Sequence, residues 1–136
     1  MAPTRARPEI ENEIKNEIGI VPSFFERIPD EALDQEWKLF KRWELEETLI
    51  PNKYKELLML AVHSETKCRY CTLFHTEVAR LYGATDDEIA EAVHLAKHTV
   101  GWSAYLNGIQ MDYDKFEKEL EKVAKHLNSE KAQAAR

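Results

Sequence analysis

The stretch PNKYKELLMLAVHSETKCRYCTLFHTEVARLYGATDDEI, residues 51–89, decides the fold of this 136-residue chain. Its first part contains the run LLMLAV, which is apolar on all sides and predicts a buried helix over 52–65, with Pro51 in the first turn. A second helix is expected over 69–82, where Gly83 stops it. Both cysteines of the chain, Cys68 and Cys71, lie at the joint between these two helices.

The residues before this stretch also predict helices. Isoleucines at four-residue intervals from Ile10 to Ile18 predict a short amphipathic helix that Gly19 ends. A linker, GIVPSFFERIP, follows it, and Asp30 is expected to cap a helix that runs to about Glu47. Its apolar stripe contains leucine and aromatic side chains and extends toward Glu44.

The residues after this stretch complete an all-α pattern. Thr85 and Glu88 form a capping box for a helix over 86–97, and residues 99–108 are expected to be helical with a kink at Gly101. Asp112 can cap a last amphipathic helix. No repeat or second domain is found, so we expect one domain over 1–136, an all-α compact helical bundle. Residues 1–8 and 128–136 are expected to be flexible.

Composition and charge restrict the function. The net charge of -6 argues against nucleic-acid binding, which needs a basic surface. No apolar run approaches the roughly 18 residues of a membrane span, and no apolar segment follows the N-terminal arginines as in a secretory signal. We therefore expect a cytoplasmic protein, where a C-x-x-C more often serves redox chemistry or metal binding than structure. A small molecule or another protein is the expected partner.

The cysteines and one histidine share a stripe. If the second central helix begins near Cys68, then Cys68, Cys71 and His75 lie at i, i+3 and i+7. The helix N-terminus and the neighbouring Lys67 and Arg69 favour a thiolate over a thiol. A histidine one turn beyond Cys71 can accept or return a proton. The pattern therefore predicts a dithiol site.

Other uses of the cysteine pair remain open. Two cysteines on a helix can be small buried side chains, with His75 as a satisfied interior residue. Zinc is the second choice, with His63 or Glu65 completing the ligand set, although no other cysteine pair follows. His94 and His98 form a weaker metal stripe. A thioredoxin domain is excluded because the segment before the C-x-x-C is helical rather than a strand.

The stretch from Pro51 to His94 resembles the alkylhydroperoxidase D and carboxymuconolactone decarboxylase superfamily. The resemblance rests on a glutamate twelve residues before the C-x-x-C and a histidine four residues after it, which Glu56, Cys68, Cys71 and His75 match. It implies the helical fold of alkylhydroperoxidase D. It also implies a thiol peroxidase or disulfide reductase in which the cysteines cycle between dithiol and disulfide. Glu56 and His75 would form its proton relay; antiparallel packing of the two central helices would bring them near one level.

The resemblance also implies partners and shows one departure. The substrate would be a hydroperoxide or a small disulfide, the reductant a lipoyl-type dithiol or a thiol protein, and the assembly a homotrimer or homohexamer. No cofactor and no metal are expected. Some members carry a second histidine between the cysteines, where this chain has Tyr70, a poorer proton carrier, which favours disulfide reductase chemistry over fast peroxidase activity. The decarboxylase branch lacks the cysteine pair, so a lyase activity is the less favoured alternative.

Overall fold

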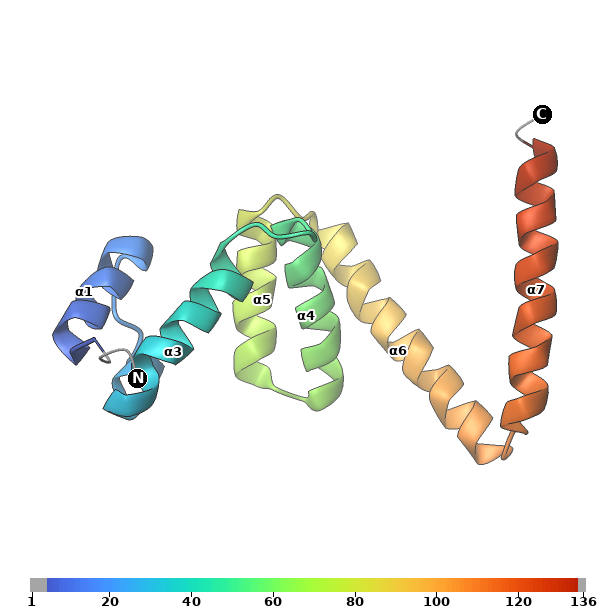
Figure 1. Cartoon of the computed structure of the whole chain (residues 1–136), viewed down its shortest axis with the longest axis horizontal. Coiled ribbons are helices and arrows are strands. Elements are labelled where there is room, and N and C mark those ends of the chain that lie inside the picture. Colours follow the sequence, from blue (N-terminus) through green and yellow to red (C-terminus); the bar gives the residue numbers. More distant parts are fainter. Residues whose placement is uncertain (1–4, 135–136) are drawn as a thin grey trace. The chain divides into compact units, whose positions relative to one another are not determined.

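A computed structural model describes residues 5–134, and these residues form helices and no strand (Figure 1). The elements are α1 (Arg7–Ile18), α2 (Ser23–Glu26), α3 (Asp30–Phe40), a π-helix η1 (Lys41–Leu45), α4 (Asn52–Thr66), α5 (Arg69–Leu81), α6 (Asp86–Gly108) and α7 (Tyr113–Ala134). The all-α prediction is confirmed. The chain divides into two compact units, Met1–Val93 and His94–Arg136. A single domain over 1–136 stays a prediction, and the expected flexible ends lie partly outside the described residues.

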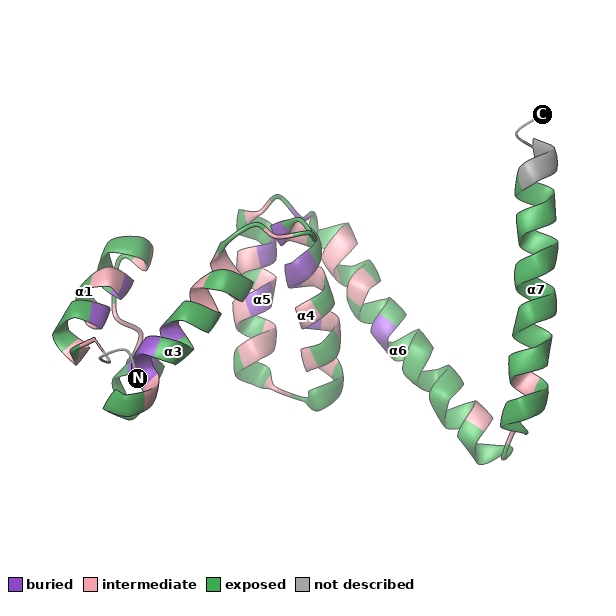
Figure 2. Ribbon diagram, viewed as in Figure 1, coloured by how far each residue is buried: buried purple, intermediate pink, exposed green. Residues whose placement is uncertain are grey.

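The core of the first unit joins α1, α2 and α3. Its fully or almost fully buried residues are Ile10, Ile14, Phe25, Leu33 and Trp37; buried positions are purple on the ribbon of Figure 2. The Phe25 ring meets Trp37 edge-on, with centroids 5.7 Å apart. As predicted, α1 ends at Gly19, whose φ of 87° lies in the left-handed region.

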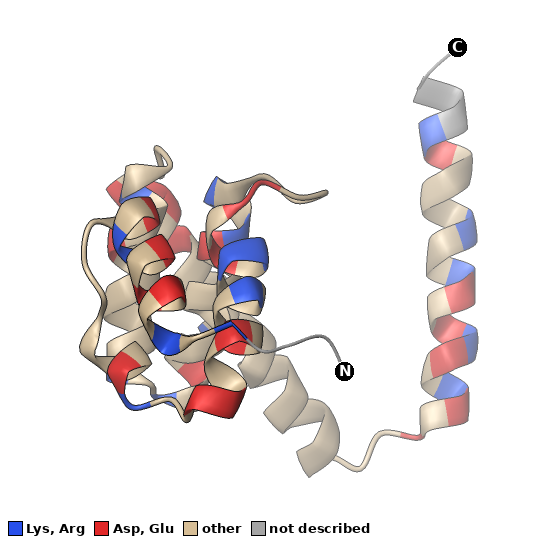
Figure 3. Cartoon of the chain, turned by 60° about the vertical axis from the view of Figure 1, so that its left-hand side comes forward, with Lys and Arg blue, Asp and Glu red and all other residues tan. Residues whose placement is uncertain are grey.

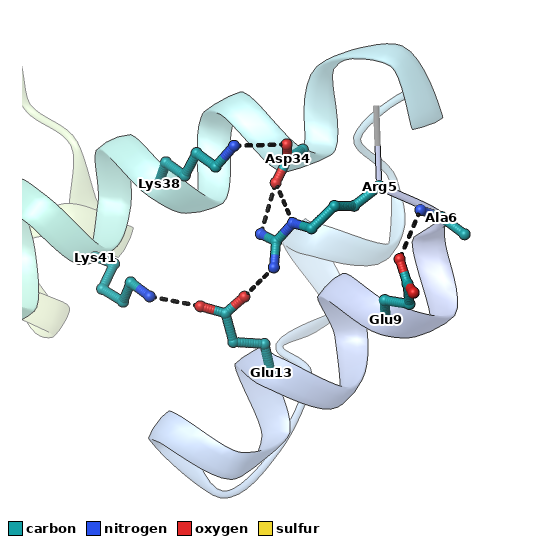
Figure 4. Close-up of polar contacts among 7 residues, drawn as sticks. All are labelled: Arg5, Ala6, Glu9, Glu13, Asp34, Lys38 and Lys41. Atoms are coloured by element: carbon teal, nitrogen blue, oxygen red, sulfur yellow. Dashed lines mark hydrogen bonds and ion pairs between the residues drawn. The ribbon is translucent and has the colours of Figure 1, made fainter. Parts of the chain in front are cut away.

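An ion-pair network ties α1 to α3 (Figure 4). Arg5 donates from Nε and Nη2 to Oδ1 of Asp34, at 2.8 and 2.6 Å, and also pairs with Glu13. Lys41 donates to the other oxygen of Glu13 at 2.5 Å, and Lys38 to Asp34 at 2.7 Å. Hydrogen bonds from Lys41 and Arg5 lower the pKa of Glu13 from 4.5 to about 2.

The helix that carries Glu44 differs from its prediction. Pro29, not Asp30, is its N-cap, and no side chain caps it. The α-helix ends at Phe40 instead of continuing to Glu47, and a π-helical turn, Lys41–Leu45, follows. In this turn the N–H of Glu46 donates to the carbonyl of Lys41, five residues back, at 2.9 Å. The linker before α3 also contains the one-turn helix α2.

The two central helices form a hairpin. α4 and α5 make the most extensive helix–helix contact in the first unit. Lys55 anchors the start of α4 by donating to the carbonyls of Trp43 and Glu46, at 3.2 and 2.6 Å. The prediction that α4 is buried on all sides is wrong for one face, because Leu58 and Val62 are 55% and 58% exposed.

The last two helices partly match the sequence patterns. Thr85 and Glu88 exchange the predicted capping-box bonds, at 2.9 and 3.1 Å. α6 does not end at Lys97 but continues as one helix to Gly108. Oδ1 of Asp112 accepts from the backbone N–H of Lys115 at 2.7 Å, which confirms its capping role for α7.

The two helices of the second unit differ in their content of charged residues. The part of α6 that belongs to it is almost free of charged side chains, whereas acidic and basic residues alternate along α7 (Figure 3). Among the residues that the structure describes, every helix is too short or too polar to cross a bilayer.

Candidate redox site

The cysteine pair lies at the N-terminus of α5. Lys67 adopts the left-handed conformation that ends α4, with φ 59°, and Cys68 follows it as the N-cap of α5. Cys68 and Cys71 form a disulfide, with their Cα atoms 5.4 Å apart. The backbone N–H of Cys71 donates to Sγ of Cys68 at 3.3 Å. One N–H group of the helix terminus therefore donates to sulfur, an arrangement that stabilises a thiolate after reduction.

Glu56 and His75 meet inside the α4–α5 hairpin. Nδ1 of His75 lies 2.8 Å from Oε2 of Glu56, and the two residues are only 5% and 0% exposed. Nineteen positions separate them in the sequence, so the antiparallel packing expected for these helices brings them together. A carboxylate that accepts from Nδ1 fixes the tautomer of the imidazole and leaves Nε2 free to exchange a proton.

His63 joins this group from the last turns of α4. Its ring stacks on that of His75, with centroids 5.2 Å apart and planes inclined by 2°. A ring nitrogen of His63 and the sulfurs of Cys68 and Cys71 all lie within 4.8 Å of one another. The sequence indicated His63 only as a possible zinc ligand, because its spacing from the cysteines does not show that its ring stacks on that of His75.

Glu44 is the site residue that the sequence prediction missed. A carboxylate oxygen of Glu44 lies within 4.8 Å of ligand atoms of Glu56 and His75. Burial raises the pKa of Glu44, and the charge of Glu56 adds to the rise, whereas His75 and Lys55 oppose it. The available signal was a carboxylate at the end of an otherwise apolar helical stripe.

A cavity of about 850 Å³ borders all of these groups except the fully buried Glu56. Its wall includes the disulfide, both histidines, Glu44 and Tyr70, and aromatic side chains that make up much of the remainder: Phe24, Phe40 and Phe74. Tyr70, which lies between the two cysteines in the sequence, is 76% exposed, and the guanidinium of Arg69 lies over its ring, 5.3 Å from the centroid. The cavity has the size and mixed lining of a small-molecule site.

The titratable groups form two clusters that are suited to different chemistry. His63 with the two sulfurs offers soft ligands for a thiophilic metal when the disulfide is reduced. The buried Glu56 and His75 and the half-buried Glu44 form a set suited to proton transfer. On α6, His98 accepts a hydrogen bond from Nε1 of Trp102 at 3.0 Å.

Three residues of the predicted signature, Cys68, Cys71 and His75, line one cavity, and the fourth, Glu56, bonds to His75. No curated protein matches the chain. The structure is similar to the crystal structure of the alkylhydroperoxidase AhpD core from Rhodospirillum rubrum, with a TM-score of 0.69 and 22% identity over 79% of this chain and 82% of that one. Residues 33–111 match the carboxymuconolactone decarboxylase family. The chain thus has an alkylhydroperoxidase D-like fold and belongs to the carboxymuconolactone decarboxylase family.

Proposed function

We propose that this protein is a thiol-dependent oxidoreductase that reduces a hydroperoxide or a small disulfide by cycling Cys68 and Cys71 between dithiol and disulfide. The observation that carries the proposal is a disulfide at a helix N-terminus, in the wall of a cavity that also contains His75. The buried hydrogen bond from His75 to Glu56 supports a proton relay to that cavity. A structural disulfide would not need these groups beside it.

The reaction with a hydroperoxide balances with two thiols. One thiolate attacks the terminal oxygen, the O–O bond breaks, and the alcohol leaves with one proton while the cysteine becomes a sulfenic acid. The second thiol then attacks the sulfenic sulfur, releases water and closes the disulfide. His75, held by Glu56, would accept the proton of the attacking thiol. A dithiol reductant restores the pair by thiol–disulfide exchange.

The lining of the cavity supports an organic substrate. Three phenylalanine side chains border it, and the net charge of the chain is negative, so an uncharged or weakly charged molecule with apolar groups fits best. The reductant must enter the same apolar cavity, and a lipoyl-type dithiol or the exposed thiol of a small protein could do so. The cytoplasmic location remains part of this proposal, since the cycle needs a reducing compartment.

Zinc binding is the second candidate function. The specific observation in its favour is the close grouping of His63 with both sulfurs. The same sulfurs are joined in a disulfide, which removes the thiolates that zinc requires. A zinc site would therefore belong to the reduced protein only.

Self-association is proposed as well. In the first unit, α4 presents Leu58 and Val62 to solvent, and in the second unit Leu120, Val123 and Leu127 of α7 are each about half exposed. Apolar side chains repeated along a helix face favour contact with a second copy. Sedimentation equilibrium would test this, with a trimer or hexamer as the expected state.

Thiol counting tests the proposed function directly. Reduced protein should lose two titratable thiols with one equivalent of an alkyl hydroperoxide or a small disulfide, and regain them with a dithiol. Cys68→Ser and Cys71→Ser should each abolish steady turnover, since neither can close the disulfide. Full turnover by both variants, in protein with unchanged circular dichroism, would contradict the dithiol mechanism.

A further inference from the structure

Glu44 combines two features that the dithiol mechanism does not use. It lies in the π-helical turn η1, a rare element that often marks functional positions. Its Oε2 atom is buried and has no hydrogen-bond partner among the described residues. The carboxyl also lines the cavity that contains both sulfurs and His75. A buried carboxylate without a partner is costly, so this position needs an explanation.

The surroundings of Glu44 determine which carboxyl of the site holds a proton. Oε2 of Glu56 has a partner, the Nδ1 atom of His75 at 2.8 Å. Within residues 5–134, no comparable donor bonds to Oε2 of Glu44. Two carboxyls this close do not both ionise readily, and the one without a hydrogen-bond donor retains the proton.

The other charged groups around Glu44 do not change this assignment. Lys55 of α4 directs its ammonium at the carbonyls of Trp43 and Glu46 and is not bonded to the Glu44 carboxyl. Four further titratable side chains line the same cavity: Glu26, Arg27, His63 and Tyr70. Burial raises the pKa of Glu44, and the charge of Glu56 acts in the same direction, so both favour the protonated carboxyl.

We propose that Glu44 is a catalytic general acid that protonates the leaving group of the substrate in the cavity. The inference rests on the proposed thiol oxidoreductase function. His75 and Glu56 take the proton of the attacking thiol, and Glu44 gives a proton to the departing oxygen or sulfur. When a hydroperoxide is reduced, the O–O bond breaks, and the alkoxide leaves as the alcohol with the proton of Glu44. Glu44 regains a proton from solvent or from the relay before the next turnover.

The leaving group provides the decisive test. An alkoxide is a poor leaving group and depends on a proton donor, whereas the aromatic thiolate released by dithiobis(nitrobenzoate) is stable without one. Glu44→Gln keeps the shape and the neutral charge of the protonated residue. Its rate with tert-butyl hydroperoxide should fall by about 10²-fold or more, the scale of general acid catalysis, while its rate with dithiobis(nitrobenzoate) stays at the wild-type value. Glu46→Gln, an exposed neighbour that pairs with Arg42, should match the wild type with both reagents.

The pH dependence of the wild-type rate provides a second test that needs no variant. With the alkyl hydroperoxide the rate should rise and then fall as the pH increases, because Glu44 loses its proton, whereas the rate with the aromatic disulfide should only rise. The role of Glu44 would be overturned by pH–rate profiles of the same shape with both reagents. It would also be overturned if Glu44→Gln lost rate equally with both reagents. A wild type that reacts with the aromatic disulfide but never with hydroperoxides or alkyl disulfides would instead refute the proposed function. Stoichiometric metal in the wild type, lost in Glu44→Gln, would make Glu44 a ligand and also overturn the proposal.

Discussion

The rings of His63 and His75 lie parallel, with their centroids 5.2 Å apart. His63 comes from α4 and lies beside the Cys68–Cys71 sulfurs, whereas His75 comes from α5 and lines the same cavity. Some relatives are expected to carry their second histidine between the cysteines, where this chain has Tyr70. A histidine near the sulfurs is thus present here, but it is contributed by the preceding helix.

His63 should therefore replace the missing histidine in function. We expect His63→Gln to lower the rate with hydroperoxide by up to about 10²-fold at neutral pH, because a proton carrier near the sulfurs is lost. Adding Tyr70→His in the same chain should recover part of that rate. Stopped-flow measurement of the two variants and of Tyr70→His alone would check this. If the double variant is no faster than His63→Gln, the two positions are not equivalent.

The buried pair of Glu56 and His75 should control the reactivity of the thiols. His75→Phe should lower the rate with hydroperoxide by about 10²-fold or more at neutral pH, and Glu56→Gln should lower it less, being one step further from sulfur. A higher pH should partly rescue both variants, because hydroxide then replaces the missing base. The measurement is a pH–rate profile of the three proteins.

Stability provides the control for that experiment. His75→Phe leaves Glu56 buried without its partner and should cost about 1–3 kcal/mol of unfolding free energy, whereas Glu56→Gln can still bond to His75. Urea unfolding followed by circular dichroism would measure both. Superimposable pH–rate profiles in folded variants would show that the pair is only structural.

The signature around the cysteines was predictable because it depends on local spacing. Helix periodicity placed Cys68, Cys71 and His75 on one stripe, and the antiparallel hairpin then brought Glu56 to His75 at 2.8 Å. Both steps depend only on the short connection between α4 and α5 and on Gly83, which ends α5. The fold class followed from the same periodicity.

Glu44 and the role of His63 were not predictable in this way. The π-helical turn at Lys41–Leu45 depends on tertiary contacts, such as the bonds from Lys55 to the carbonyls of Trp43 and Glu46, which no local pattern indicates. The exposed face of α4 was not predictable either, because an apolar run does not show which of its faces the rest of the chain covers. Residues that contact a partner and residues of a buried core have similar sequences.

Acid should loosen the contact between α1 and α3. The pKa of Glu13 in the folded protein, about 2, lies below its usual value of 4.5, so the native state binds fewer protons than the unfolded chain. The stabilisation from Glu13 is therefore complete above about pH 5 and is lost as the pH falls toward 2. Urea midpoints at pH 7 and pH 3 should differ more for the wild type than for Glu13→Gln. Glu17→Gln, an exposed change on the same helix, should behave like the wild type, and an equal acid loss in all three would contradict the assignment.

Zinc should bind only to the reduced protein. Reduction frees two thiolates beside His63, a set of three ligands typical of an open zinc site, and binding would release protons. We expect isothermal titration calorimetry to detect zinc binding to the reduced chain, weaker binding to His63→Gln and none to the disulfide form. Bound zinc should slow the reaction with hydroperoxide, because it occupies the nucleophile.

The oxidised protein should keep its helical circular dichroism in the presence of a chelator, since its sulfurs are already joined. Protein that purifies with one zinc and unfolds on chelation would show that the cysteines serve structure, and the redox proposal would then have to be abandoned.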